Sequence, residues 1–128
     1  MIQTANFNPT TDPKLKCTCG HPLCHKPSVS QHTLNRVQLM RDDANRPFTI
    51  TSGGRCKYHP NEARKSKVGD HGEYVAVDIA YSTELERNEI MVLAGRYGAT
   101  AVAVGKDFVH CAWRVLKTND MRVRTWEY

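Results

Sequence analysis

Three residues of the types that bind catalytic zinc lie on or beside two segments that are predicted to be strands. His71 precedes a segment rich in β-branched residues, Asp78 lies within that segment, and His110 lies within a later one. Strands hold side chains in fixed directions, so two neighbouring strands can aim these three residues at one point. Catalytic zinc sites take three protein ligands, often histidine with a carboxylate, and leave a fourth position for water. The pattern indicates such a site, although Asp78 is also placed to cap a following helix.

The elements that would position these residues follow from the spacing of apolar residues and from turn signals. Together they predict an α+β domain with a mainly antiparallel central sheet and flanking helices. Ser28 and Ser30 are candidate N-caps for the first helix, and Ser82 or Thr83, with Glu86 in the first turn, forms a plausible capping-box pattern at the second. The tail after residue 116 is a candidate for one more short strand. The expected elements are helices at 30–44 and 82–98 and strands at 48–52, 74–80, 100–105 and 107–116.

Length and composition are those of one globular domain. The chain has 128 residues, of which 40% are hydrophobic and 24% are charged, and no apolar run approaches the ~20 residues of a membrane-spanning helix. Residues 1–27 are polar and interrupted by prolines, so we expect an irregular segment packed on a domain at 28–128. The start of the chain has no basic stretch followed by an apolar one. We therefore expect a monomer without membrane contact, made in the cytoplasm and delivered elsewhere by another factor.

The formal net charge of +5 favours an acidic partner, and bacterial cell wall and nucleic acid both qualify. The basic residues are scattered, apart from those at 63–67 and 122–128. Neither group has the pattern of interleaved aromatic residues that is typical of a nucleic-acid surface. Binding to nucleic acid rests on charge alone and is not the interpretation that we favour.

Three motifs occur in order between residues 52 and 114: SGGRCKYHPN at 52–61, GDHGEYVAVDI at 69–79 and KDFVHCAWR at 106–114. They resemble the S-G-(Y/F)-R, S-x-H-x-x-G-x-A-x-D and (F/W/Y)-(V/I)-H motifs of the zinc D-Ala-D-Ala carboxypeptidase family, in the small single-domain form found in phage endolysins. The resemblance covers about half the chain. It implies the hedgehog/DD-peptidase fold and a phage-encoded enzyme that hydrolyses peptide bonds in the stem peptides of bacterial peptidoglycan.

The resemblance also implies a role for each matched residue. His71, Asp78 and His110 would bind one catalytic zinc ion. Asp107 takes the place of the family's acidic general base, usually Glu, although it is also suited to a hairpin turn. Arg55 takes the place of an arginine that stabilises an oxyanion or binds a substrate carboxylate, although it is also suited to a loop salt bridge.

Several positions depart from the family pattern. Gly69 stands where relatives have serine, Tyr74 stands where they have glycine, and Ala112 stands where many have aspartate. A carboxylate two residues after the last histidine would orient that ligand, so its loss bears on metal affinity or on specificity. The basic loop at 63–67 replaces a glycine pair that is common in relatives.

Cysteines form a second candidate site. Three of the five lie in CTCGHPLCH at 17–25, and an odd number without a signal segment argues against a disulfide framework. Cys17, Cys19 and Cys24, with two histidines nearby, are candidate ligands of a second, structural zinc ion. Because the usual C-x-x-C spacing is absent, we favour reduced cysteines packed near the terminus over that site.

Two functional hypotheses follow. The first is a zinc peptidase, either an endopeptidase or a D,D-carboxypeptidase, that acts on bacterial peptidoglycan. The alternative is a metal-binding but non-catalytic structural or binding protein of the same fold, such as a component of a phage virion. The departures at Asp107 and Ala112 give the alternative some weight, and mutation of Asp107 separates the two.

Overall fold

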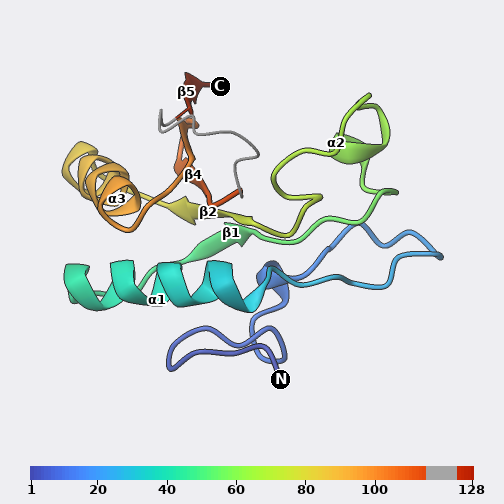
Figure 1. Ribbon diagram of the computed structural model, residues 1–128, viewed down its shortest axis with the longest axis horizontal. Helices are drawn as coiled ribbons and strands as arrows, with labels where there is room; N and C mark the ends of the chain where they lie inside the picture. The colour runs from blue at the N-terminus through green and yellow to red at the C-terminus, as the bar shows by residue number, and fades with distance from the viewer. Residues whose placement is uncertain (115–123) are drawn as a thin grey trace.

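One mostly antiparallel sheet forms the centre of the protein (Figure 1). The computed structural model describes residues 1–114 and 124–128, and within them five strands pair in the order β1-β2-β4-β3-β5. Neighbouring strands are antiparallel, except that β3 and β5 are parallel. The predicted mixed α and β domain is confirmed at this level. The elements are η1 (Pro13–Leu15), α1 (Gln31–Ala44), β1 (Ile50–Ser52), α2 (Pro60–Ala63), β2 (Ala76–Ala80), α3 (Glu84–Arg96), β3 (Ala101–Val104), β4 (Phe108–Ala112) and β5 (Arg124–Glu127).

Both long helices begin where the sequence predicts a cap. The Ser30 hydroxyl accepts a hydrogen bond from the backbone N–H of Thr33 at the start of α1, and Asn45 ends that helix in the left-handed conformation, with φ 53°. Thr83 and Glu86 form the reciprocal capping box of α3. Each N-cap stabilises its helix by about 1 kcal/mol, because it satisfies backbone donors that otherwise lack a partner.

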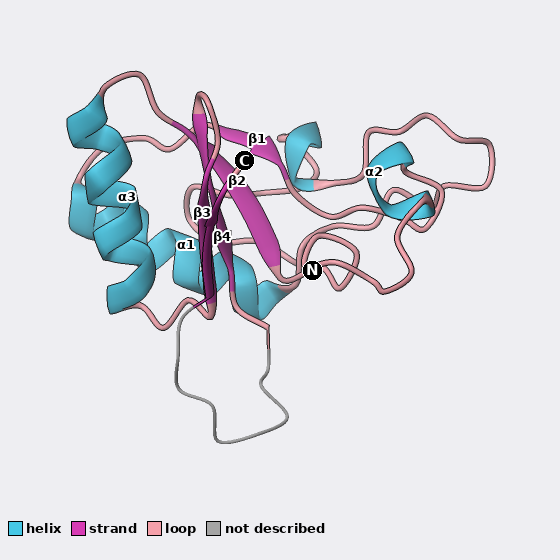
Figure 2. Cartoon of the chain, turned by 90° about the horizontal axis from the view of Figure 1, so that it is seen from above, coloured by secondary structure: helices cyan, strands magenta, loops and turns pink. Residues whose placement is uncertain are grey.

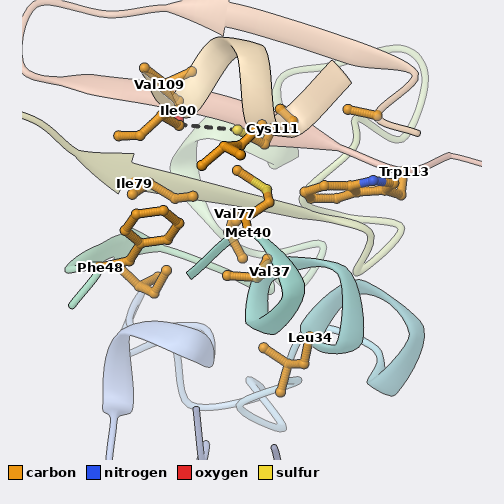
Figure 3. Packing of buried hydrophobic residues seen from close by; sticks show 14 of the residues in the cluster. Leu34, Val37, Met40, Phe48, Val77, Ile79, Ile90, Val109, Cys111 and Trp113 are labelled. Atoms are coloured by element: carbon orange, nitrogen blue, oxygen red, sulfur yellow. Dashed lines mark hydrogen bonds between the residues drawn. The ribbon is translucent and has the colours of Figure 1, made fainter. Parts of the chain in front are cut away.

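One face of the sheet packs against the two long helices. Figure 2 shows α3 beside the strands and α1 running behind them. Alternate residues of β2 and β4 point toward them and are fully buried, and each such valine or isoleucine contributes roughly 1.5–3 kcal/mol. The core around this face, drawn in Figure 3, includes Val77, Ile79, Val109 and Cys111 from the sheet, Val37 and Met40 from α1, and Ile90 from α3.

The opposite face of the sheet carries small residues around a polar pair. Ala76, Ala101 and Ala112 form a separate buried cluster there. Asp78 on β2 is the direct cross-strand partner of His110 on β4. Since side chains alternate along a strand, this pair lies on the face away from α1 and α3. The alanines leave space in which longer polar side chains can meet.

The N-terminal segment lies along the side of α1 that faces away from the sheet (Figure 1). The Gln38 side chain on α1 accepts hydrogen bonds from the Thr4 hydroxyl and from the Asn6 backbone N–H, each at 2.8 Å. Leu15 of η1 is fully buried in the main core. The segment is therefore packed on the rest of the protein although most of it is irregular.

The stretch between β1 and β2 that holds the basic loop at 63–67 contains the short helix α2, which the sequence pattern did not predict. Glu62 on this helix is buried and accepts hydrogen bonds from the Lys65 ammonium at 2.7 Å and from the Gly69 backbone N–H at 3.1 Å. Burial acts to raise the pKa of Glu62, but these contacts hold the pKa below its ordinary value. These contacts with the buried carboxylate hold the basic loop against the domain.

The remaining boundaries match the prediction with small shifts. β2 begins at Ala76, because Tyr74 has a left-handed backbone, with φ 64°, that a strand does not accommodate. The hairpin predicted at Gly105 and Lys106 joins β3 and β4, and the tail supplies β5. The end of the strand predicted at 107–116 and the start of the basic tail at 122–128 lie outside the described residues.

Candidate metal centre

His71, Asp78 and His110, the three predicted ligands, lie together on the sheet face that points away from α1 and α3. Asp78 and His110 meet across β2 and β4, and His71 reaches them from the turn before β2. Nε2 of His71 lies 3.2 Å from Oδ1 of Asp78 and 3.1 Å from Nδ1 of His110. That Nδ1 atom lies 3.0 Å from the same carboxylate oxygen, and all three residues are buried. The group can hold a metal ion.

The other nitrogen of each imidazole is held by an acceptor. Nδ1 of His71 lies 2.7 Å from the carbonyl oxygen of Gly53, and Nε2 of His110 lies 3.1 Å from a carboxylate oxygen of Asp70. A carbonyl and an ionised carboxylate only accept, so these two nitrogens carry the ring protons. The electron pairs of His71 Nε2 and His110 Nδ1 are then directed at Asp78. Such outer partners orient metal-binding histidines.

Three electron-pair donors therefore converge when both rings are neutral: two imidazole nitrogens and one carboxylate oxygen. At 3.0–3.2 Å they would repel one another unless a cation lies between them. A proton on His110 removes the repulsion in one of these contacts at a time, whereas one metal ion removes the repulsion in all three. Two imidazoles and a carboxylate are also a donor set that zinc accepts. The residues present thus fit a bound zinc ion.

The electrostatics of the site keep its carboxylates ionised. Burial acts to raise the pKa of Asp78, but His110 and His71, when their rings are protonated and donate to it, hold that pKa at about 2. Burial also acts to raise the pKa of Asp70, which contacts with His110 and Arg114 hold well below its usual range. Burial acts to lower the pKa of His110, and the two carboxylates raise it by more. Negative charge therefore surrounds the point where the ligand atoms meet.

Asp70 is a site residue that the sequence interpretation missed. Its carboxylate accepts from His110 and also from Nε of Arg114 at 2.9 Å. It thereby supplies the orienting carboxylate that is lost at Ala112, a residue that is buried among other alanines. The signal available in the sequence was an acidic residue directly before a predicted ligand, but nothing local shows that it would face His110 instead of His71.

Arg55 forms the loop ion pairs that the sequence allowed, and its role toward an oxyanion or a substrate carboxylate stays a prediction. Its guanidinium donates to the Ser52 hydroxyl at 3.1 Å and lies 3.8 Å from Glu62 and 3.9 Å from Asp78, so it takes part in ion pairs. It also lines the cleft at the metal centre. Its buried Nε atom has no hydrogen-bond partner among the described residues.

Asp107 lies in the exposed turn between β3 and β4. Its backbone carbonyl accepts from the Tyr81 N–H at 3.0 Å, as expected of a turn residue. Phe108 and His110 line the cleft at the metal centre, whereas Asp107 is not among the described residues that line it. The role of Asp107 as a general base stays a prediction.

The cleft at the metal centre is open and has a volume of roughly 780 Å³. Aromatic side chains stand on one side, with the rings of His110 and Trp126 5.2 Å apart between centroids. Basic side chains border the rest. Trp126 is thus a cleft residue, brought here because β5 pairs with β3. The basic lining residues are Arg55, Arg64, Lys65, Lys67 and Arg114.

One departure from the family pattern, Gly69, has a local explanation, whereas nothing in the structure explains the tyrosine at position 74. A side chain at Gly69 would meet the Lys65 ammonium, 2.7 Å from the position of an added Cβ, and the Glu62 carboxylate at 3.1 Å. The buried Glu62 and its partner thus occupy the space that a serine would take. Tyr74 has φ 64°, a conformation that glycine adopts without strain and tyrosine does not.

A second group that can hold a metal ion consists of Cys17, Cys19, Cys24 and Cys56. The sequence pointed to the first three, and the fold adds Cys56 from the loop after β1. The two neighbouring histidines, His21 and His25, are exposed and outside this group. The ring of His21 instead stacks on that of Tyr58, with centroids 4.2 Å apart.

No protein-family model matches this chain, and no curated protein matches its sequence. Among the described residues, no helix is both long enough and apolar enough to cross a membrane. The geometry of the two clusters is therefore the principal basis for a proposal about function.

Proposed function

We propose that the protein is a zinc-dependent peptidase that cleaves stem peptides of bacterial peptidoglycan, with the hedgehog/DD-peptidase fold that its motifs imply. The observation that carries the proposal is the convergence of three buried electron-pair donors at an open cleft. His71, Asp78 and His110 would hold the zinc ion. Three protein ligands leave a position for a reacting molecule, which distinguishes catalytic from structural zinc sites. When bound, zinc supplies Lewis acidity, which polarises a carbonyl group and lowers the pKa of water.

The chain's own residues would prepare the reaction by orientation and charge. Gly53 and Asp70 hold the two imidazoles so that each presents one nitrogen to the metal. Arg55, which lines the cleft, would donate to the oxygen on which negative charge develops, or to a substrate carboxylate. Asp107 would move the proton, provided that its turn brings the carboxylate over the cleft when substrate binds.

The lining of the cleft fits the proposed substrate. Stem peptides are short and carry free carboxylates, and five basic side chains border the cleft. Phe108, Trp126 and Tyr128 offer apolar surface for alanine side chains and for the peptide backbone. A mostly hydrophobic peptide without carboxylates would gain nothing from the basic border, so charge favours a wall peptide over such a substrate.

A second candidate is a metal-binding protein of the same fold without catalysis. The exposed position of Asp107, outside the residues that line the cleft, favours it. Under this alternative the cleft would bind wall peptides but would not cleave them.

The test measures bound metal and the release of new amino groups from purified peptidoglycan, for the wild type, His71→Ala and His32→Ala. His32 is exposed on α1, away from the metal centre, and serves as the matched control. We expect zinc-dependent release by the wild type and by His32→Ala and none by His71→Ala. Metal binding by the wild type without release of amino groups from several types of cell wall would favour the non-catalytic protein. Retention of full activity by His71→Ala would exclude this metal centre.

A further inference from the structure

The four thiols of the cysteine cluster meet at one point although they come from two distant parts of the chain. The sulfur of Cys56 lies 3.7 Å from that of Cys17 and 3.5 Å from that of Cys19. All four sulfur atoms, including that of Cys24, lie within 4.8 Å of one another. All four are free thiols in the structure. The cluster does not depend on the proposed peptidase activity.

These separations match the geometry of one metal ion. Zinc–sulfur bonds are about 2.3 Å long, so the corners of a tetrahedron around zinc lie about 3.8 Å apart. A disulfide would instead bring two sulfurs to about 2.05 Å. The observed pairs at 3.5 and 3.7 Å lie near the tetrahedral value and far from a covalent bond.

Two tight turns direct the thiols inward. The backbone N–H of His21 points at the sulfur of Cys19, with a donor–acceptor distance of 3.5 Å, and that of Lys26 points at the sulfur of Cys24, at 3.2 Å. Gly20 and Lys26 have left-handed backbones, with φ 73° and 51°, that produce these turns. N–H groups that donate to sulfur favour the thiolate form, which is the form that binds metal.

The glycine pair after β1 brings Cys56 to the other three. Gly53 and Gly54 pack against the backbone of the N-terminal segment, and a Cβ atom on Gly53 would lie 2.6 Å from the Leu15 carbonyl oxygen. The Gly54 N–H donates to that same oxygen, and the Cys17 N–H donates to the carbonyl of Pro27. Only glycine, which has no Cβ atom, permits this close approach of the two backbone segments. Cys56, two positions after Gly54, is thereby brought to the other three cysteines.

We propose that Cys17, Cys19, Cys24 and Cys56 form a structural zinc site that fastens the N-terminal segment to the edge of the cleft. Four protein thiolates fill a tetrahedral zinc ion and leave no position for a reactant, so the site would be closed and non-catalytic. Cys56 adjoins Arg55, and both line a hollow next to the metal centre. The site would therefore hold the chain that carries Arg55.

The first test uses the metal-free wild type titrated with Co²⁺, which reports its ligands by its absorption. We expect thiolate-to-cobalt charge-transfer bands in the near ultraviolet and the intense visible bands of a tetrahedral site. His71→Ala should keep these bands, and Cys24→Ser should lose most of their intensity. Cys111→Ala is the matched control, since Cys111 is buried in the main core outside the cluster. A wild-type spectrum without thiolate bands would overturn the proposal.

The second test covers the case in which Cys24→Ser does not fold. The zinc-loaded wild type should contain about two zinc ions, one for each cluster. Its four cluster thiols should resist an aromatic disulfide reagent and react at least ~10-fold faster after a chelator removes zinc. Equal reactivity with and without zinc would contradict the site, as would a mass showing two disulfides in the freshly purified protein. Loss of the peptidase activity alone would leave this result unchanged.

Discussion

The two metal-ligand clusters of this protein are built in different ways. His71, Asp78 and His110 are placed mainly by the sheet, because the register of β2 and β4 sets Asp78 opposite His110. The cysteine cluster is placed by turns and by a glycine pair that lets two irregular segments touch. The first cluster offers three ligands at an open cleft, and the second offers four.

From this difference we infer that the two clusters serve different purposes, the histidine cluster a reactive metal ion and the cysteine cluster a structural one. A reactive metal needs ligands held by rigid elements and one position left for substrate, and the sheet face provides both. A structural metal needs only a full set of ligands, which loops can supply because the metal itself then orders them. Changes at one cluster should therefore leave the other nearly unaffected.

The largest expected effect comes from Asp78→Asn. The amide keeps the size of the carboxylate but loses its charge, so the three-donor site should bind zinc far more weakly. We expect peptidoglycan cleavage to fall by at least ~10³-fold, since the metal stabilises the transition state by several kcal/mol. Amine-release kinetics measure the loss. The thiolate bands of the cobalt protein should persist, and their disappearance would show that the clusters are not independent.

The next largest effect concerns Asp107→Asn. If Asp107 transfers the proton, the substitution should lower kcat by ~10²–10³-fold with bound zinc unchanged. Glu84→Gln, an exposed carboxylate at the start of α3, is the control and should leave kcat as it is. Unchanged kcat in Asp107→Asn would remove Asp107 from the mechanism.

A smaller effect is expected at Asp70, which positions His110 without touching the metal. Asp70→Asn should weaken zinc binding at the histidine cluster by ~10–100-fold, because the ring of His110 loses the carboxylate that orients it. Competition with a chromogenic chelator measures the zinc affinity. The cysteine cluster should keep its affinity. Equal weakening at both clusters would indicate general unfolding and would contradict a positioning role.

The smallest effect is at Tyr74, which lies between the two regions. Its N–H donates to the His71 carbonyl, and its own carbonyl accepts from Ser30. Tyr74→Val should lower the free energy of unfolding by about 1–2 kcal/mol, since a β-branched residue fits a positive φ poorly. Tyr74→Gly should change it by less than about 1 kcal/mol. Urea unfolding compares the two variants, and the reverse order would be inconsistent with strain at this position.

Features that depend on local sequence could be predicted, and those that depend on distant contacts could not. The caps of α1 and α3 and the hairpin between β3 and β4 follow from residues within a few positions of each other. The convergence of His71, Asp78 and His110 is an exception, since it spans distant positions and was predicted mainly because the three motifs resemble those of a known zinc peptidase family. Short α2 was missed because its burial depends on Glu62, a charged residue that carries no apolar signal.

The missing site residues share a physical reason. Asp70 contacts a residue on β4, 40 positions away in the sequence, and Cys56 meets Cys17 across 39 positions. Trp126 reaches the cleft through the parallel pairing of β5 with β3. Local sequence patterns do not predict these long-range contacts, because the contacts form only when the strands have paired in their order and the glycine pair has packed.

The most direct test of the central claim is a zinc titration of the metal-free protein, followed by release of amino groups from peptidoglycan. The account predicts no release without metal, and release that rises only as the histidine cluster fills and levels off when it is full. The Cys24→Ser variant, if folded, should show the same rise with one equivalent fewer. Cleavage by the metal-free protein, or none at any zinc concentration, would contradict the assignment of the histidine cluster as a catalytic metal centre.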